Sequence, residues 1–95
     1  MEASIINSDT VFHRNESTSL SRLGPDEGIM VAFEAGVYVR LNESAIMVWE
    51  LVDGATPVSA LVDRYAAYFS LPVEQAQPDV VACLQELLSL QVIHG

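Results

Sequence analysis

The residues best suited to catalysis in this sequence are one cysteine and two histidines. Cys83 is the single thiol, and His13 and His94 lie near opposite ends of the chain. A nucleophilic thiol needs a base beside it, and a metal centre needs ligands at a recognisable spacing, which these residues lack. Cys83 also lies in the apolar run VVACLQELLSL, a context typical of a small core residue. We therefore expect no catalytic residue, no metal site and no cofactor, and predict that the chain is not an enzyme.

The charged residues narrow the classes of partner. Thirteen acidic residues stand against four arginines and no lysine, which gives a formal net charge of −9. A surface of this sign repels phosphates, so nucleic acid is not an expected partner. No run reaches the roughly 20 apolar residues that span a bilayer, and the first thirty residues lack the pattern of a signal peptide. The sequence thus predicts a cytoplasmic protein with no membrane partner.

The first half of the chain has the alternation typical of short strands. Residues 1–17 are polar with two apolar islands, which predicts an N-terminal arm or an extra edge strand. Turn residues in GPDEG and at Ala35-Gly36 separate the runs that follow. The predicted strands are 18–23, 28–34 and 37–41.

Helical periodicity begins at Asn42. Its side chain can accept from amides two and three residues further on, and Gly54 can adopt the left-handed conformation that closes a helix. These two residues predict a first helix over 43–53, with Ile46 and Trp49 on its buried face.

Two further helices are predicted after residue 54. Thr56 as cap and Pro57 as first helical residue predict a helix that ends near Ser70. Because Pro78 would remove a backbone hydrogen bond from inside a helix, we expect a turn at 73–77 and a third helix over 78–90. The expected apolar stripe of that helix is Val81, Leu84, Leu87 and Leu88.

Together these elements predict an α+β fold of the winged helix-turn-helix type, a three-stranded antiparallel sheet followed by three helices. The usual partner of that fold is DNA, but residues 42–95 carry seven acidic residues and one arginine. A recognition helix without Lys or Arg binds phosphates poorly. An acidic winged-helix regulator that acts through protein contacts is one alternative.

The strand over 37–41 is expected at an edge of the sheet, where unpaired main-chain groups can bind an extended peptide. The third helix is the candidate wall of the resulting groove, and its acidic residues could meet basic side chains of a peptide. The strand residues expected at this site are Val37, Tyr38, Val39, Arg40 and Leu41. The helix residues expected there are Asp79, Val80, Cys83 and Glu86.

The segments GVYVRLNESAIMVWELVDGATPVSALVDRYAAYF and DVVACLQELLSLQVI resemble the PqqD family. The order and spacing of Leu41-Asn42, Trp49 and Asp53-Gly54 carry the resemblance. It implies that residues 18–95 form a PqqD-like recognition element for precursors of ribosomally synthesised, modified peptides (RiPPs). In that family the leader segment of the precursor docks as an added strand between the third strand and the third helix. Carried over by position, 37–41 is the pairing edge, and the opposite wall is Asp79, Val80, Cys83 and Leu87.

The resemblance implies two possible pathways. One is the discrete leader-binding protein of lasso-peptide biosynthesis, which delivers its peptide to a separate leader peptidase. The other is the PqqD-type peptide chaperone of pyrroloquinoline quinone synthesis. The run from Tyr38 to Glu43 is more similar to the lasso-peptide protein. In either pathway cleavage and tailoring belong to partner enzymes, since no residue here could cleave a peptide bond.

Overall fold

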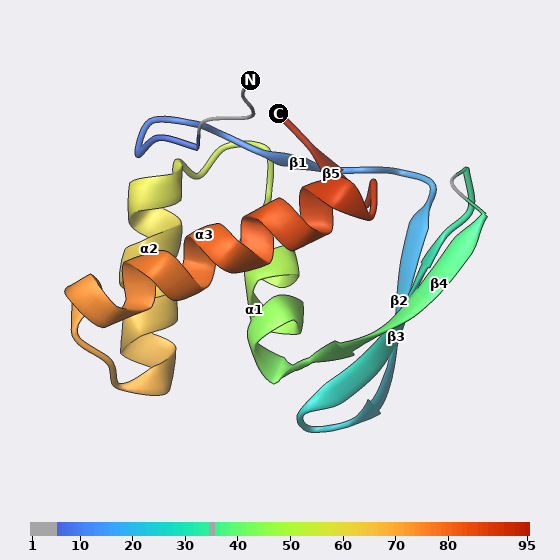
Figure 1. The fold of residues 1–95 in the computed structure, drawn as a ribbon, viewed down its shortest axis with the longest axis horizontal. Coiled ribbons are helices and arrows are strands. Elements are labelled where there is room, and N and C mark those ends of the chain that lie inside the picture. The colour runs from blue at the N-terminus through green and yellow to red at the C-terminus, as the bar shows by residue number, and fades with distance from the viewer. Residues whose placement is uncertain (1–5, 35) are drawn as a thin grey trace.

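The chain has the predicted α+β fold, with three antiparallel strands followed by three helices (Figure 1). The structure is a computed structural model that describes residues 6–34 and 36–95, so Ala35 of the predicted turn and the start of the predicted 1–17 arm lie outside it. No helix within the described ranges is both long and apolar enough to cross a membrane. The elements are β1 (His13–Arg14), β2 (Thr18–Gly24), β3 (Glu27–Ala32), β4 (Val37–Asn42), α1 (Glu43–Leu51), α2 (Val58–Phe69), α3 (Val73–Ser89) and β5 (Ile93–His94).

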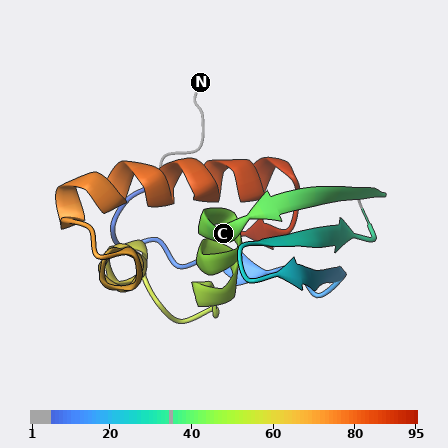
Figure 2. The ribbon, with the colours of Figure 1, turned by 90° about the horizontal axis from the view of Figure 1, so that it is seen from below.

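The main sheet has the order β2-β3-β4, so β2 and β4 are its two edges. Figures 1 and 2 together show that β4 is the edge on the side of α3, whereas β2 lies farthest from that helix. Pairing between β3 and β4 is continuous from Glu27 opposite Asn42 to Ala32 opposite Val37. Pairing between β2 and β3 shifts its register just before Gly24. The two edges therefore differ both in regularity and in what lies beside them.

A second, two-stranded sheet joins the two ends of the chain. In it β1 pairs antiparallel with β5, with His13 opposite His94 and Arg14 opposite Ile93. The two imidazole rings stack with their centroids 5.3 Å apart. The Arg14 guanidinium lies 4.8 Å from the centroid of the Trp49 ring. The described part of residues 1–17 thus crosses the helical half of the molecule and pairs with the C-terminal strand.

Asn42 starts α1 as the sequence predicts. Its side-chain oxygen accepts a hydrogen bond from the amide of Ala45 at 3.0 Å. The helix ends at Leu51, before the predicted end at residue 53, because Val52 already has an extended backbone with ψ 111°. Gly54 has the predicted positive φ, 78°, but it lies in the following loop and does not close the helix.

The predicted cap of α2 by Thr56 is wrong, because the Thr56 hydroxyl donates its hydrogen bond to the Asp53 carboxylate. The Asp53 carboxylate accepts from the amides of Ala55 and Thr56 at 3.0 and 2.8 Å and from the Thr56 hydroxyl at 2.8 Å. The Ala55 amide first, and then the Thr56 hydroxyl and amide, hold the pKa of Asp53 below its usual value. Pro57 takes the cap position itself, without a side-chain hydrogen bond to the helix.

One continuous α3 replaces the turn predicted at 73–77 and the helix predicted from Pro78. Pro72 is its cap residue, and the Pro72 carbonyl accepts the amide of Ala76 at 3.0 Å. Pro78 lies inside the helix, where it has no amide to donate to the carbonyl of Glu74. Ala76 is completely buried, so core packing holds the first turns and the helix tolerates this lost hydrogen bond near its exposed end.

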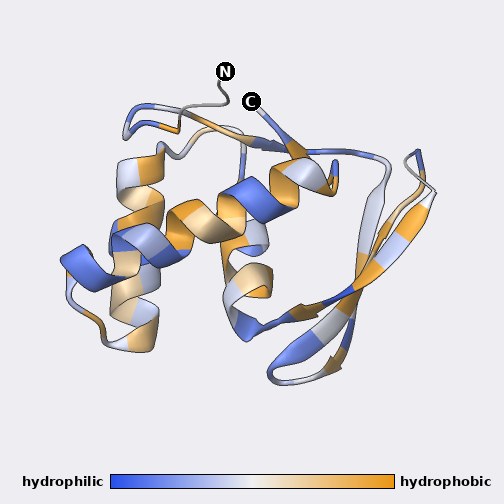
Figure 3. Cartoon of the chain, in the orientation of Figure 1, coloured by the Kyte–Doolittle hydropathy of each residue, from blue (hydrophilic) through white to orange (hydrophobic). Residues whose placement is uncertain are grey.

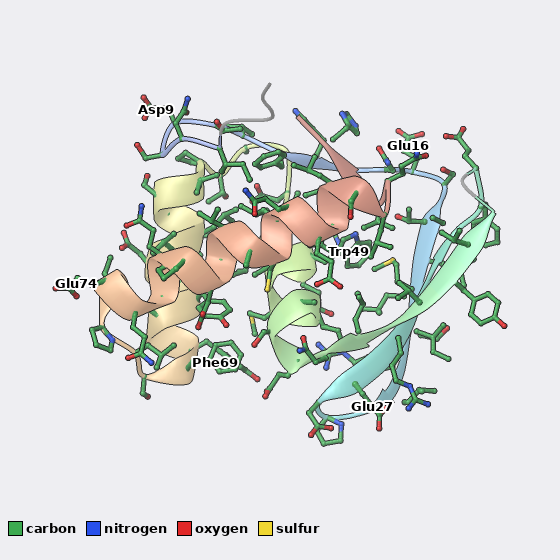
Figure 4. The ribbon with its side chains drawn as sticks, in the orientation of Figure 1. Asp9, Glu16, Glu27, Trp49, Phe69 and Glu74 are labelled. Carbon is green, nitrogen blue, oxygen red and sulfur yellow. The ribbon has the colours of Figure 1, made fainter. Side chains whose placement is uncertain are left out.

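A single hydrophobic core joins the helices to the inner face of the sheet. Figure 3 shows orange and blue segments alternating along α3, as expected of a helix that buries one face. That face is rotated from the predicted one, since Val80 is fully buried and Val81 is only half-buried. Trp49 is a core residue, as predicted, and its indole N–H donates to the Val92 carbonyl at 3.4 Å (Figure 4).

Candidate functional site

The direction of the main-chain groups in the central strand decides which groups of β4 are left unpaired. Beyond the last paired residues of β2 and β3, the amide of Phe33 donates to the Ser17 carbonyl at 2.8 Å. Residues in a strand direct their main-chain groups alternately to the two neighbouring strands. Counting back from Phe33, the N–H and C=O of Met30 therefore point toward β4, where Met30 lies opposite Val39.

The same register assigns every residue of β4. The residues whose main-chain groups bond to β3 are Val37, Val39 and Leu41. The amides and carbonyls of Tyr38 and Arg40 point outward, and no strand in residues 6–34 or 36–95 pairs with that side of β4. These two residues supply the hydrogen-bonding groups of the open edge.

A hollow of about 430 Å³ lies beside the inner end of this edge. It is formed where the β2-β3 turn, the end of β4, the first turn of α1 and the second half of α3 meet. Its lining residues are Asp26, Glu27, Arg40, Leu41, Asn42, Ala45 and Glu86. Three of them are carboxylic acids and one is a cation, Arg40, whose guanidinium lies 3.5 Å from the Glu27 carboxylate. The hollow therefore has a surplus of negative charge.

The helix α3 forms the wall opposite β4 with only some of the predicted residues. Asp79 and Glu86 are exposed and Cys83 is half-buried. The spacings of four and three residues place these three side chains on one face of the helix. Val80 and Leu87 are 0% exposed, so they belong to the core. They support the wall from behind, and a peptide docked on this surface would not contact them.

The predicted strand residues also divide between core and surface. Leu41 is 2% exposed and Val39 is half-buried, so the inner face of β4 packs on the core. Tyr38 is 77% exposed and Arg40 also faces solvent. Val37, near the hairpin tip, is 41% exposed. The strand thus has an open backbone edge and an open outer face.

Sequence reasoning misses four residues of the hollow, because each has another evident role in a turn, a cap or a helix. These are Asp26, Glu27, Asn42 and Ala45. The signal that could have found Glu27 is the hairpin register, which places it opposite Asn42. Figure 4 shows Glu27 near the β2-β3 turn, at the end of the sheet next to the start of α1.

Cys83 lies in surroundings that keep its thiol protonated. Burial first, and then the charges of Glu86 and Asp79, raise the pKa of Cys83 from 9.0 to about 11. Such a thiol is a weak nucleophile near neutral pH. Among the described residues, no group of three His, Cys, Asp or Glu side chains is placed to hold a metal ion. The groove therefore offers a ligand hydrogen-bonding groups, charge and a partly apolar wall.

Comparison with known proteins gives one family and one related fold. The family model of coenzyme PQQ synthesis protein D (PqqD) matches residues 27–93, more than half of the chain. A solved structure of TbiB1 in complex with the TbiA(beta) leader peptide is similar, with a TM-score of 0.74 and 18% sequence identity over 87% of this chain and 95% of that chain. At this identity the likeness shows a shared fold. None of the curated proteins matches the chain. The family match includes β4 and α3, whereas β2 lies before it.

Proposed function

Because the chain belongs to the PqqD family, we propose that it is a recognition element that binds the leader segment of a ribosomally synthesised precursor peptide. The leader docks as an added strand on the outer edge of β4, facing α3, and the rest of the precursor stays available to tailoring enzymes. A leader peptide is bound to TbiB1, a chain of the same fold, which supports this class of ligand.

The observation that carries this proposal is the open edge of β4 beside a hollow. Tyr38 and Arg40 direct unpaired amides and carbonyls outward, and α3 stands across from them with Glu86 in the lining. An added strand pairs with these main-chain groups whatever its own sequence, and the residues lining the groove then select among sequences. The edge therefore explains affinity, and the hollow explains specificity.

We assign the peptide contacts to the accessible residues of this groove. On the strand side they are Val37, Tyr38, Val39 and Arg40, and Leu41 lines the hollow although it is only 2% exposed. On the helix side they are Asp79, Cys83 and Glu86, and the turn adds Asp26 and Glu27. The chain is proposed to bind and present its peptide without catalysing a reaction, which agrees with the protonated thiol of Cys83. It is proposed to act in the cytoplasm, where ribosomes release the precursor.

The recipient of the bound peptide is proposed to be a separate leader peptidase of a lasso-peptide pathway. The resemblance of the run from Tyr38 to Glu43 supports this assignment. The PqqD description of the matching family favours a second candidate, a peptide chaperone of pyrroloquinoline quinone synthesis. The genes beside this one distinguish the two pathways, since the first needs a peptidase and the second a radical enzyme. Acceleration of precursor cleavage by the purified peptidase when this chain is added would establish the lasso-peptide assignment.

Leader binding can be tested by removing one outward amide from β4. We expect fluorescently labelled leader peptides from neighbouring genes to bind with a dissociation constant below about 10 μM. Arg40→Pro removes an edge amide and should weaken binding at least about tenfold, whereas Arg40→Ala, which keeps the amide, should change it less. Fluorescence anisotropy measures both.

Arg22→Pro on β2 is the matched control. The register directs the main-chain groups of Arg22 away from β3, and its side chain pairs with Glu50 as that of Arg40 pairs with Glu27. Both proline variants should keep the circular dichroism spectrum of the parent, and Arg22→Pro should bind the leader normally. Equal loss of affinity in the two variants, or no binding of any leader by the folded parent, would contradict the proposal.

A further inference from the structure

The surface along the open edge of β4 changes from apolar at the hairpin tip to acidic at the hollow. At the tip, Phe33 is 66% exposed and lies close in sequence to the exposed Val37 and Tyr38. At the other end, Glu27 and Glu86 line the hollow. Figure 3 shows the loss of apolar character along the strand, since the outer half of β4 is orange and pale and its hydrophilic, blue segments lie toward α1. A docked strand would meet both environments.

The positive charge available at the hollow is small. Arg40 is its one cation among the described lining residues, its side chain is 72% exposed, and its closest carboxylate contact is 3.5 Å long. The whole chain has four arginines and no lysine. A cation brought by a ligand would therefore find carboxylates with little competition from the protein, and charge complementarity of this kind selects partners.

On the basis of the proposed function, we infer which peptide segment the groove selects. The docked strand carries a Lys or Arg side chain that enters the hollow near Glu27 and Glu86. About four residues away, and on the same face of the strand, it carries an aromatic or large aliphatic side chain that lies against the tip at Phe33 and Tyr38. Four residues of an extended strand span roughly 13 Å. The stretch of β4 from Asn42 to Tyr38 has the same number of steps, and both of these side chains lie on the outer face of the strand, as does Glu27 opposite Asn42.

The order of the two side chains follows from the direction of pairing. An added strand that runs antiparallel to β4 has its N-terminal end at Asn42, beside the hollow, and its C-terminal end at Val37. Antiparallel pairs are slightly more stable per residue than parallel ones. The basic residue therefore precedes the apolar residue in the sequence of the selected peptide.

Selection from a phage library of random 12-residue peptides tests this inference without knowledge of the natural leader. We expect the enriched peptides to share a Lys or Arg followed about four positions later by an aromatic or large aliphatic residue. A parallel selection uses the double variant Glu27→Gln/Glu86→Gln, from which the basic residue should disappear while extended apolar peptides remain. The control double variant Glu16→Gln/Glu74→Gln makes the same change in net charge far from the hollow (Figure 4) and should keep the basic residue.

The consensus peptide then gives a quantitative test by fluorescence anisotropy. Replacing its Lys by norleucine, which keeps the aliphatic stem, should weaken binding about tenfold, and raising the salt from 50 to 300 mM should weaken the parent peptide more than the norleucine peptide. The Glu27→Gln/Glu86→Gln variant should bind the Lys and norleucine peptides equally well. The Glu16→Gln/Glu74→Gln variant should still prefer the Lys peptide. Enrichment of peptides without a basic residue, or in the reverse order, would overturn the inference and leave leader binding intact. Failure to enrich any peptide with folded protein would contradict leader binding itself.

Discussion

The two edges of the sheet, β2 and β4, have similar lengths and share one central strand, but they differ in regularity and in what lies beside them. Pairing along β4 is regular over its whole length, and the hollow and α3 lie beside its outer side. The pairing of β2 shifts between Arg22 and Gly24, and such irregularities protect edges from unwanted pairing. The side chain of Arg22 also ties that edge to Glu50 of α1 at 2.9 Å. These differences favour β4 as the edge to which a peptide adds.

The family match covers one of the two edges. The PqqD family model begins at Glu27, the first residue of β3, and so includes β4 and α3 but not β2. The matched part of the chain therefore contains the β4 edge and the α3 helix beside it.

Val39→Pro should have the largest effect, because it acts between β4 and the central strand. The Val39 amide bonds to β3 opposite Met30, which is fully buried. Its loss leaves a buried carbonyl unsatisfied and should lower the free energy of unfolding by about 3 kcal/mol or more. Tyr38→Pro, one residue earlier, removes an outward amide and should keep the fold while weakening leader binding. Urea denaturation of both variants checks the assignment, and a larger loss of stability in Tyr38→Pro than in Val39→Pro would show that the pairing is reversed.

Gly28→Ala should damage the β2 side of the sheet and spare the β4 edge. A Cβ atom there would lie 3.0 Å from the Ser21 carbonyl oxygen, 3.1 Å from Leu20 Cδ1 and 3.3 Å from Ile46 Cδ1. The two closest contacts are with β2, so we expect a loss of about 1–3 kcal/mol in the free energy of unfolding, with leader affinity changed less than about twofold. Gly24→Ala, with no neighbouring atom within 4 Å, is the control. A large loss of affinity in folded Gly28→Ala would show that the two edges are coupled.

The alkylation rate of Cys83 reports on the β4 side of the sheet, because Cys83 lies on the face of α3 across from β4. Its pKa of about 11 keeps thiolate scarce in the folded chain, so at pH 9 alkylation by iodoacetamide should be at least about tenfold slower than in urea. The sign follows from the raised pKa: folding disfavours the thiolate, so stability is unaffected well below pH 9 and falls as the pH rises toward 11. Equal alkylation rates in the two states would contradict the burial of Cys83.

Bound leader should slow alkylation of Cys83 further. The control is a cysteine introduced on the other edge by Ser21→Cys in a Cys83→Ser background, since Ser21 is exposed on β2. Saturating leader should slow the reaction of Cys83 by roughly fivefold and leave that of the introduced cysteine unchanged. Mass spectrometry of the alkylated chains measures both rates, and equal protection at the two positions would place the leader elsewhere or on both edges.

Sequence reasoning finds the fold and the edge because local chemistry determines both. The cap at Asn42, the turn residues before β3 and the alternation in β4 are each signalled by residues within a few positions of one another. It fails where tertiary packing outweighs a local preference. Pro78 argues against a helix start at residue 73, yet α3 begins there, because packing of the buried Ala76 against the core stabilises the first turns. The Thr56 prediction fails for a local reason, because the Thr56 hydroxyl donates to the carboxylate of Asp53, three residues earlier.

The candidate site could be predicted only in part for a related reason. The strand residues follow from their spacing, but the wall depends on the rotation of α3 about its axis. The observed rotation places Val80 in the core and leaves Asp79, Cys83 and Glu86 on the open face. The hollow combines residues from four segments of the chain, so its composition depends on hairpin register and helix packing together.

Arg22→Ala should have the smallest effect and tests whether the β2 edge needs its link to α1. The Arg22 and Glu50 side chains are 44% and 39% exposed, and such exposed ion pairs contribute about 0.5 kcal/mol. We expect a small loss in the free energy of unfolding, further reduced in 0.5 M salt, and no change in leader affinity. Chemical denaturation and anisotropy measure the two quantities. If Arg22→Ala instead produced concentration-dependent dimers in sedimentation experiments, the Arg22-Glu50 pair would be what keeps β2 from pairing. The two edges would then differ in two ways: the Arg22–Glu50 pair would prevent β2 from pairing with another strand, and only β4 would have a groove beside it.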